Sequence, residues 1–489
     1  MAIPAETFFL RPDSETTLQH QIQRLIVEAI LSGRCLPGEK MPSSRKLADH
    51  LGVARITVTI AYTELVSNEY LISRGRSGYF VANTAPSRPK FELPAQGEAN
   101  QIDWSRVISQ RFSDEVPLVR PSNWRDYKYP FIYGQSDPSL FDHSNWRTCA
   151  LQAVGRKDFD ILATDYYERD DPMLVEFIAR QILPRRGIAA KPEEILITLG
   201  AQNALWITAQ LLLTQRRVAV IENPCFPGLR QILNQTRCNT VLVDVDAAGL
   251  PPEKLPAQID VVFTTPSHHC PSNATMPVSR RHALLKLAAR NGFVIVEDDY
   301  EFEISFLKSP SPALKSLDQS GSVIYTGSFS KSLFPGLRLG YLVAPEPFVR
   351  EARALRSSVL RHPPGLIQRT AAYFLSLGHY DAQIARMGRI YQKRRSLMEQ
   401  CMAENGLLMP RQGTFGGSSF WMRTPEDIDS SELALNLRND GVLIEPGRAF
   451  FARNSEVPGY YRLAYSSIPS ANIPEGMALI AKRIGEAMR

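Results

Sequence analysis

The sequence lacks the features of membrane, secreted and disulfide-bonded proteins. No run of 18 apolar residues occurs, and the stretch LWITAQLLL (205–213) is too short to cross a bilayer. The first residues, MAIPAETFFLRPDSE, show no charged segment followed by a long apolar stretch, so we expect no signal peptide. Six cysteines are scattered without a CxxC pair, which favours reduced thiols over disulfides or a zinc site. We therefore expect a cytoplasmic protein without a metal site.

What the chain does contain is ample apolar material for a large globular fold. Hydrophobic residues make up 44% of 489 residues, and the net charge of +6 is only weak evidence for nucleic acid. Changes in composition divide the chain into three zones. Residues 14–82 form a compact basic unit, residues 83–125 are a linker rich in proline and polar residues, and strands and helices alternate over residues 126–489.

The basic unit has the pattern of a helix-turn-helix followed by a wing. Helical spacing and start and stop signals predict helices over residues 17–31, 45–51 and 54–66. The third helix should bury an apolar face made of Ile56, Ile60, Leu65 and Val66. The runs YLIS and YFVA then read as two strands on either side of a basic turn.

This arrangement predicts DNA binding, because a helix-turn-helix inserts the start of its second helix into the major groove. A small helical bundle with solvated charges is the alternative, but the order of helix, turn and wing favours DNA. Arg45 and the arginines of the wing are placed to neutralise phosphates. The expected DNA-binding residues are Ser44, Arg45, Arg55, Thr57, Thr59, Arg74 and Arg76.

The third zone predicts an α/β fold with a mostly parallel sheet. Short apolar runs alternate with helical stretches, as buried parallel strands and their crossover helices do. The predicted strands are ILIT (195–198), VAVI (218–221), VVFT (261–264), VIVE (294–297) and VIYT (323–326).

The side chains needed to hold pyridoxal phosphate (PLP) follow two of these strands. Lys331 offers an amine for a Schiff base, and Asp298 and Tyr300 offer a carboxylate for the pyridine nitrogen and a phenol for the ring oxygen. Residues two apart in extended chain point to one face, so Asp298 and Tyr300 should act together. Asp299 remains the alternative for the pyridine nitrogen. The backbone amides of Ala201 and Gln202, at a strand-to-helix turn, should face the phosphate.

Two resemblances now become plain. Residues 15–82 resemble the GntR-type winged helix, through LPGEKMPSSRKLADHLGVARITVTIAYTELVSNEYLISRGRSGYFV. The later zone resembles fold-type-I PLP proteins, and the two together resemble the MocR/GabR family of bacterial transcription regulators. This implies a winged helix followed by an aminotransferase-like domain, with Lys331 as the lysine that carries the internal aldimine.

The resemblance also implies roles for further residues. Ser328, Ser330 and Arg338 match phosphate ligands. For Arg338 taken alone, a surface ion pair is the alternative, but its fixed distance from Lys331 favours a phosphate ligand. Phe226 stands where the family stacks an aromatic residue on the cofactor, and a plain core phenylalanine is the alternative. Arg462 matches the arginine that binds a substrate carboxylate and would suit a sulfonate; a structural ion pair is its alternative.

One departure from the aminotransferase pattern bears on activity. Related enzymes carry Asn-Pro-x-Gly, whereas this chain has TPSHHCPSNAT, with Cys270 at the asparagine position and Asn273 at the glycine position. The TPSH part itself matches the regulators. The ring oxygen therefore loses one partner, and full transaminase competence is not expected.

The resulting hypothesis is a cytoplasmic regulator that binds operator DNA and senses a small amine or amino acid, similar to γ-aminobutyrate, taurine or an ectoine derivative, by external aldimine formation with PLP. The family implies a homodimer with head-to-tail exchange of DNA-binding domains, and a dimer suits paired half-sites. The rival hypotheses are an active aminotransferase with an accessory DNA-binding domain and a DNA-binding protein whose PLP fold is a relic.

Overall fold

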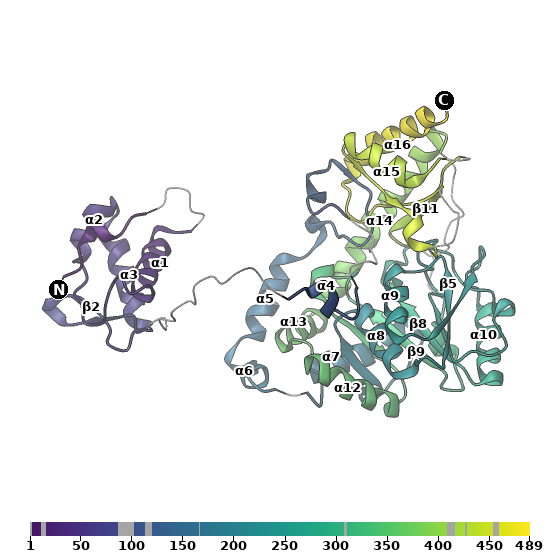
Figure 1. Ribbon diagram of the computed structural model, residues 1–489, viewed down its shortest axis with the longest axis horizontal. Helices are drawn as coiled ribbons and strands as arrows, with labels where there is room; N and C mark the ends of the chain where they lie inside the picture. The colour runs from purple at the N-terminus through teal and green to yellow at the C-terminus, as the bar shows by residue number, and fades with distance from the viewer. Residues whose placement is uncertain are drawn as a thin grey trace. The chain divides into compact units, whose positions relative to one another are not determined.

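The structure, a computed structural model, describes residues 2–10, 16–86, 102–112, 120–165, 167–307, 311–407, 416–425, 428–452 and 459–489. Residues 14 and 15 of the predicted basic unit, and residues 87–101 and 113–119 of the predicted linker, lie outside these ranges. The chain divides into two compact units, Met1–Gln110 and Arg111–Arg489 (Figure 1). None of the helices in the described ranges has the length and apolar character needed to cross a membrane.

The N-terminal unit is a three-helix core with a two-stranded wing. Its helices are α1 (Leu18–Leu31), α2 (Ser44–Leu51) and α3 (Arg55–Ser67), and β1 (Leu71–Ser73) pairs antiparallel with β2 (Tyr79–Val81). The side chains of Thr17 and Ser43 cap α1 and α2 by accepting a hydrogen bond from a backbone amide of the first turn. Gly52 ends α2 with a φ of 68°, a conformation that favours glycine.

The predicted apolar face of α3 was wrong in part. Ile56 and Ile60 are 63% and 40% exposed, while Val58, Ala61, Tyr62 and Leu65 are buried against α1 and α2. The buried residues follow the spacing i, i+3, i+4, i+7 from Val58, which is a single helical face. Tyr62 can join this face because its hydroxyl donates to the Pro42 carbonyl at 2.8 Å.

A seven-stranded sheet forms the centre of the C-terminal unit, in the order β4-β10-β9-β8-β7-β5-β6. The five predicted strands are present, and the sequence prediction missed β6 and β10. β10 runs antiparallel to both of its neighbours, and the other pairs are parallel. The strands are β4 (Ile195–Thr198), β5 (Val218–Asn223), β6 (Asn239–Asp244), β7 (Val261–Thr264), β8 (Val294–Asp299), β9 (Val323–Ser328) and β10 (Gly340–Val343).

Helices cover both faces of this sheet. One face packs against α8 (Ala201–Leu212), α9 (Pro227–Thr236) and α12 (Glu346–Leu360). The other packs against α7 (Pro172–Phe177), α10 (Val278–Asn291) and α13 (Gly365–Ser376). Consecutive residues of one strand therefore enter the cores on opposite faces of the sheet, as Ile295 and Val296 of β8 do.

A smaller group of elements follows at the C-terminal end of the chain (Figure 1). The strands β11 (Ser419–Arg423), β14 (Tyr460–Ala464) and β13 (Glu445–Pro446) form an antiparallel sheet. Its apolar side shares one core with α14 (His379–Glu404), α15 (Ser430–Asn439) and α16 (Ile473–Ala487). β12 (Val442–Leu443) pairs with β3 (Tyr129–Pro130), which ties the start of the C-terminal unit to its end.

Candidate cofactor site and DNA-binding surface

A cavity of about 380 Å³ opens where β8 and β9 end, beside the start of α8. All nine residues predicted to bind the cofactor line it, and so does Arg462. They come from six separate parts of the chain, so only the fold brings them together. These lining residues are Ala201, Gln202, Phe226, Asp298, Tyr300, Ser328, Ser330, Lys331, Arg338 and Arg462.

Lys331 lies in the turn after β9 with its amine facing the cavity. Its Nζ is 4.1 Å from the ring centre of Tyr133, and a Cβ on Gly134 would lie 2.7 Å from Nζ. Gly134 has a φ of 78°, a backbone conformation that favours glycine. Burial lowers the pKa of Lys331 to about 8, with Arg120 and Arg462 acting in the same direction. A substantial neutral fraction near pH 8 makes this amine a competent nucleophile.

Asp298 and Asp299 point to opposite faces of the sheet, which distinguishes their roles. Asp298 faces the cavity and accepts a hydrogen bond from Thr326 Oγ1 at 3.3 Å. Burial raises its pKa to about 7. Asp299 instead lies in the opposite core, where Arg186 Nε donates to it at 2.6 Å and the Tyr325 hydroxyl at 2.9 Å. Asp299 is therefore occupied by a structural ion pair, and Asp298 is the carboxylate available to a ligand.

Tyr300, Phe226 and Cys270 form the aromatic and thiol part of the cavity wall. The Phe226 ring packs over Gly228, where an added Cβ would lie 2.6 Å from the ring. Burial raises the pKa of Cys270 to about 12, so this thiol stays protonated and is not a thiolate nucleophile. Cys270 thus occupies the wall where related enzymes have an amide, and it offers only a weak donor.

The start of α8 provides an anion site at the other end of the cavity. Gly200 precedes the helix with a φ of 84°, and the free backbone amides of the first turn lie beside Ala201 and Gln202. A Cβ on Gly200 would lie 3.4 Å from Arg338 Nη2, which donates to the Leu199 carbonyl at 3.0 Å. Helix amides, a guanidinium and the hydroxyls of Ser328 and Ser330 together form a phosphate-sized donor set.

Two arginines and one carboxylate lie on the remaining wall. Arg462 Nε donates to Glu445 Oε2 at 2.8 Å, and Arg120 Nε donates to Glu445 Oε1 at 3.0 Å. The Arg462 guanidinium also lies 4.0 Å from the ring centre of Tyr133 and 4.6 Å from that of Phe450. The ion pair considered for Arg462 thus exists, and it fixes a side chain that still lines the cavity. Sequence reasoning missed Arg120, Tyr133, Glu445 and Phe450.

These groups match the parts of PLP. The cavity offers an amine for the aldehyde, a buried carboxylate for the pyridine nitrogen, a phenol for the ring oxygen and a donor set for the phosphate. Burial raises the pKa of Asp298, and Thr326 donates to it only at 3.3 Å, so this carboxylate would be stabilised by a cationic N–H donor such as a protonated pyridine nitrogen. The residues present therefore fit the cofactor.

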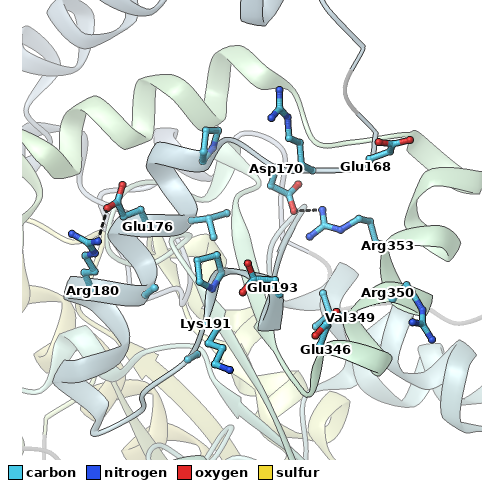
Figure 2. Close-up of a pocket in the computed structure, with 16 residues that line it drawn as sticks. Glu168, Asp170, Glu176, Arg180, Lys191, Glu193, Glu346, Val349, Arg350 and Arg353 are labelled. Atoms are coloured by element: carbon cyan, nitrogen blue, oxygen red, sulfur yellow. Dashed lines mark hydrogen bonds and ion pairs between the residues drawn. The ribbon is translucent and has the colours of Figure 1, made fainter.

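A larger groove of about 810 Å³ lies elsewhere in the C-terminal unit and contains none of the predicted residues. Figure 2 shows two ion pairs among its charged side chains. Arg353 bonds Asp170 at 2.7 Å, and Arg180 pairs with Glu176 at 3.1 Å. Of these two spaces, the smaller cavity is the one that brings the predicted residues together.

In the N-terminal unit, the predicted DNA contacts lie at the surface. Arg45, Arg55, Arg74 and Arg76 are exposed, and Arg55 Nε donates to Ser44 Oγ at 3.4 Å across the turn between α2 and α3. Thr57 and Thr59 are half-buried, and Thr59 Oγ1 donates to the Arg55 carbonyl at 3.0 Å. In the wing, the Arg74 guanidinium stacks 4.7 Å from the ring centre of Phe80.

The described residues contain no cluster of three histidine, cysteine or acidic side chains able to hold a metal ion. His269, whose role the sequence left open, is fully buried and bonded to Ser272 Oγ at 2.7 Å and to the Pro224 carbonyl at 3.0 Å. It is a core histidine that supports the loop carrying Cys270.

Comparison with known proteins identifies both units. Residues 158–480 match the family model "Aminotransferase class I and II", and residues 18–81 match "Bacterial regulatory proteins, gntR family". The fold is similar to a kynurenine aminotransferase of Pyrococcus horikoshii solved with PMP, with a TM-score of 0.71 and 26% identity over 79% of this chain and 99% of that chain.

Full-length relatives combine the two units in the same order. The chain is 58% identical to the HTH-type transcriptional regulator TauR of Rhodobacter capsulatus, over 99% of this chain and 100% of TauR. It is 30% identical to the probable rhizopine catabolism regulatory protein MocR of Rhizobium meliloti, over 79% of this chain and 77% of MocR. The chain therefore belongs to the MocR-type family of HTH transcriptional regulators, in which a GntR winged helix is joined to a class I and II aminotransferase domain.

Proposed function

We propose that the C-terminal unit binds PLP and senses a small amine, and that amine binding changes the DNA affinity of the winged helix. The observation that supports this most is the convergence of Lys331, Asp298, Tyr300 and Arg338 on one cavity. When bound, PLP supplies an aldehyde that forms a covalent bond with a primary amine. Lys331 would hold that bond at rest, and an incoming amine would take its place.

The charges of the cavity wall favour an amine with one acid group. Arg338, Asp298 and Lys331 are each assigned to a part of the cofactor. Arg120 and Arg462 then remain, and Glu445 neutralises one of their two charges. The wall thus has one net positive charge to offer, which a single carboxylate or sulfonate would balance. A second acid group would remain uncompensated in a buried site, which costs binding free energy.

A regulator of this kind acts in the cytoplasm, where the DNA is, and we propose that it works as a homodimer with head-to-tail exchange of winged helices. Two winged helices related by symmetry suit an operator with two half-sites. The amine can shift the DNA-binding equilibrium only if it binds one arrangement of the dimer more tightly than the other.

Titration of the cofactor-loaded protein with γ-aminobutyrate, taurine and glutamate, followed by absorbance, tests the proposal. We expect saturable spectral changes with amines that bear one acid group, and a weaker response to glutamate, which adds a second. Product analysis in the same samples separates sensor from enzyme. Cys270 replaces the usual amide partner of the ring oxygen, so we expect little keto or aldehyde product. Rapid multiple turnover would establish the aminotransferase alternative, and a protein that binds no PLP would establish the relic.

A further inference from the structure

A small chamber lies behind Lys331, next to the main cavity. Its volume is about 10 Å³, which is room for about one water-sized group. Gly134, Gln135, Ser330 and Lys331 line both spaces. Apart from one isoleucine, the chamber is otherwise lined by polar and aromatic residues from distant parts of the chain, and its further lining residues are Ser136, Glu301, Ile304, Tyr391, Ser418 and Ser466.

Glu301 is the one acidic residue among those that line this chamber, and it is only 1% exposed. Its Oε1 accepts a hydrogen bond from Ser418 Oγ. Within the described ranges, its Oε2 accepts no hydrogen bond of normal geometry, and the buried Tyr133 hydroxyl is its nearest donor, whose weak hydrogen bond acts to lower the pKa of Glu301. A buried carboxylate oxygen in this state has capacity for a further donor, and leaving that capacity unfilled costs free energy.

The charges around Lys331 make Glu301 the natural partner for its ammonium form. Arg120 and Arg462 repel a positive charge on Lys331, and the carboxylate of Glu445 is taken up by those two arginines. Glu301 lines the chamber together with Lys331, and its carboxylate raises the pKa of the lysine against the effect of burial. A charged Lys331 is therefore poorly accommodated in the main cavity and well accommodated next to Glu301.

We propose that this chamber receives the Lys331 ammonium whenever the lysine is not bonded to the cofactor, and that Glu301 is the positioning residue that holds it there. The inference rests on the proposed function, because a protein that binds amines through PLP must release this lysine each time an amine takes its place. During exchange, the carbon–nitrogen bond to Lys331 breaks as the bond to the effector nitrogen forms. Two protons from the effector ammonium pass to the lysine nitrogen, which leaves as an ammonium.

Binding of PLP and of pyridoxamine 5′-phosphate to the full-length, cofactor-free chain tests this proposal without any effector. Pyridoxamine 5′-phosphate has no aldehyde, so it occupies the site while Lys331 stays free. Glu301→Gln keeps the size of the side chain and the bond to Ser418 but removes the charge. Lys331 is free both before and after pyridoxamine 5′-phosphate binds, so we expect Glu301→Gln to change this affinity less than threefold. Bonding to PLP takes the lysine away from Glu301, so losing that charge-assisted hydrogen bond in the cofactor-free state should strengthen PLP binding about tenfold or more. Glu301→Asp should keep the PLP affinity close to that of the wild type.

Two comparisons exclude a structural explanation. Glu303→Gln changes a neighbouring carboxylate that bonds the Tyr380 hydroxyl at 2.8 Å and lies outside both cavities, so it should leave both affinities unchanged. In a Lys331→Met background there is no ammonium to hold, and adding Glu301→Gln should then have no effect on the noncovalent binding of PLP.

An equal gain in PLP affinity in the Lys331→Met background would overturn the inference, since Glu301 would then act on the ligand or on the fold. Unchanged PLP affinity in Glu301→Gln would overturn it as well. Failure of the proposed function is distinguishable from both, because it would appear in the wild-type protein as a lack of response to amines.

Discussion

Replacing Asp298 by asparagine should have opposite effects on the cofactor-free and the cofactor-loaded protein. In the described part of the chain, the hydrogen-bond partner of this carboxyl is Thr326 and not a cation. Burial raises its pKa from 3.8 to about 7. A rise of this size corresponds to about 4 kcal/mol between the two protonation states, which is an upper bound on what the substitution recovers.

The direction of the pH effect follows from the raised pKa. Between about pH 4 and pH 7 the folded protein holds a proton on Asp298 that the unfolded chain has lost. The free energy of unfolding contributed by this group therefore falls as the pH rises through that window and stays low above it. Asp298→Asn removes this pH dependence, because asparagine does not titrate. We expect the cofactor-free variant to be more stable than wild type by about 1–4 kcal/mol at pH 8 and about equally stable near pH 4.

With PLP bound, Asp298→Asn should instead be less stable than wild type, because a protonated pyridine nitrogen supplies the cation that Asp298 needs. Asparagine loses this charge-assisted hydrogen bond, so PLP affinity should fall about 10- to 100-fold. Denaturant unfolding at pH 4 and pH 8, with and without PLP, measures both effects.

Asp299→Asn is the matched control for this experiment. It breaks the buried pair with Arg186 and should destabilise the protein with and without the cofactor, by about 3–5 kcal/mol. A cofactor-free Asp298→Asn protein that is less stable than wild type at pH 8, or that binds PLP normally, would refute the assignment of Asp298.

The remaining predictions concern the lysine, the acid group and the DNA. Borohydride reduction and peptide mapping should place PLP on Lys331, and Lys331→Ala should lose the covalent link but remain folded; PLP on another lysine would refute this. Arg462→Ala should raise the effector concentration needed at least tenfold without removing PLP, and Arg120→Gln should act in the same direction; unchanged titrations would place the acid group elsewhere. Arg55→Ala should weaken operator binding by about 1–3 kcal/mol if it contacts a guanine. Arg76→Ala should instead weaken all DNA sequences alike and reduce the slope of affinity against salt, and a sequence-specific loss in this variant would contradict its phosphate role.

Most of the central sheet and of the cofactor-site residues could be predicted from the sequence, because the polar residues of the site directly follow apolar strands. Apolar runs identified five of the seven strands, and the polar residues that follow β8 and β9 fell at the same sheet edge. β6 was missed because its residues NTVLVD are largely exposed or half-buried and do not form a continuous apolar run. The antiparallel strand β10 is as short and as buried as β4 and β7, which were predicted, so its own length and burial do not explain why it was missed.

The residues that the sequence missed are those placed by contacts between distant segments. Arg120 precedes the sheet by some 75 residues and reaches the cavity through Glu445, which lies far along the chain in β13. Glu301 follows Tyr300 directly, but its role depends on Ser418 and on the chamber behind Lys331. No local pattern carries this information.

The error in α3 has a similar origin. Ile56 and Ile60 are as apolar as the buried residues, and the sequence pattern cannot show that Tyr62 satisfies its hydroxyl through Pro42 and so occupies the core. The prediction chose the more apolar residues, whereas packing against α1 and α2 selects the face that begins at Val58.

Measuring operator affinity and cofactor absorbance in one titration of the loaded, full-length protein, with an amine that bears one acid group, shows whether chemistry at Lys331 controls DNA binding. We expect both signals to change with the same midpoint and Lys331→Ala to lose the coupled response. A complete change in absorbance with unaltered operator affinity would mean that the cofactor site does not control the winged helix.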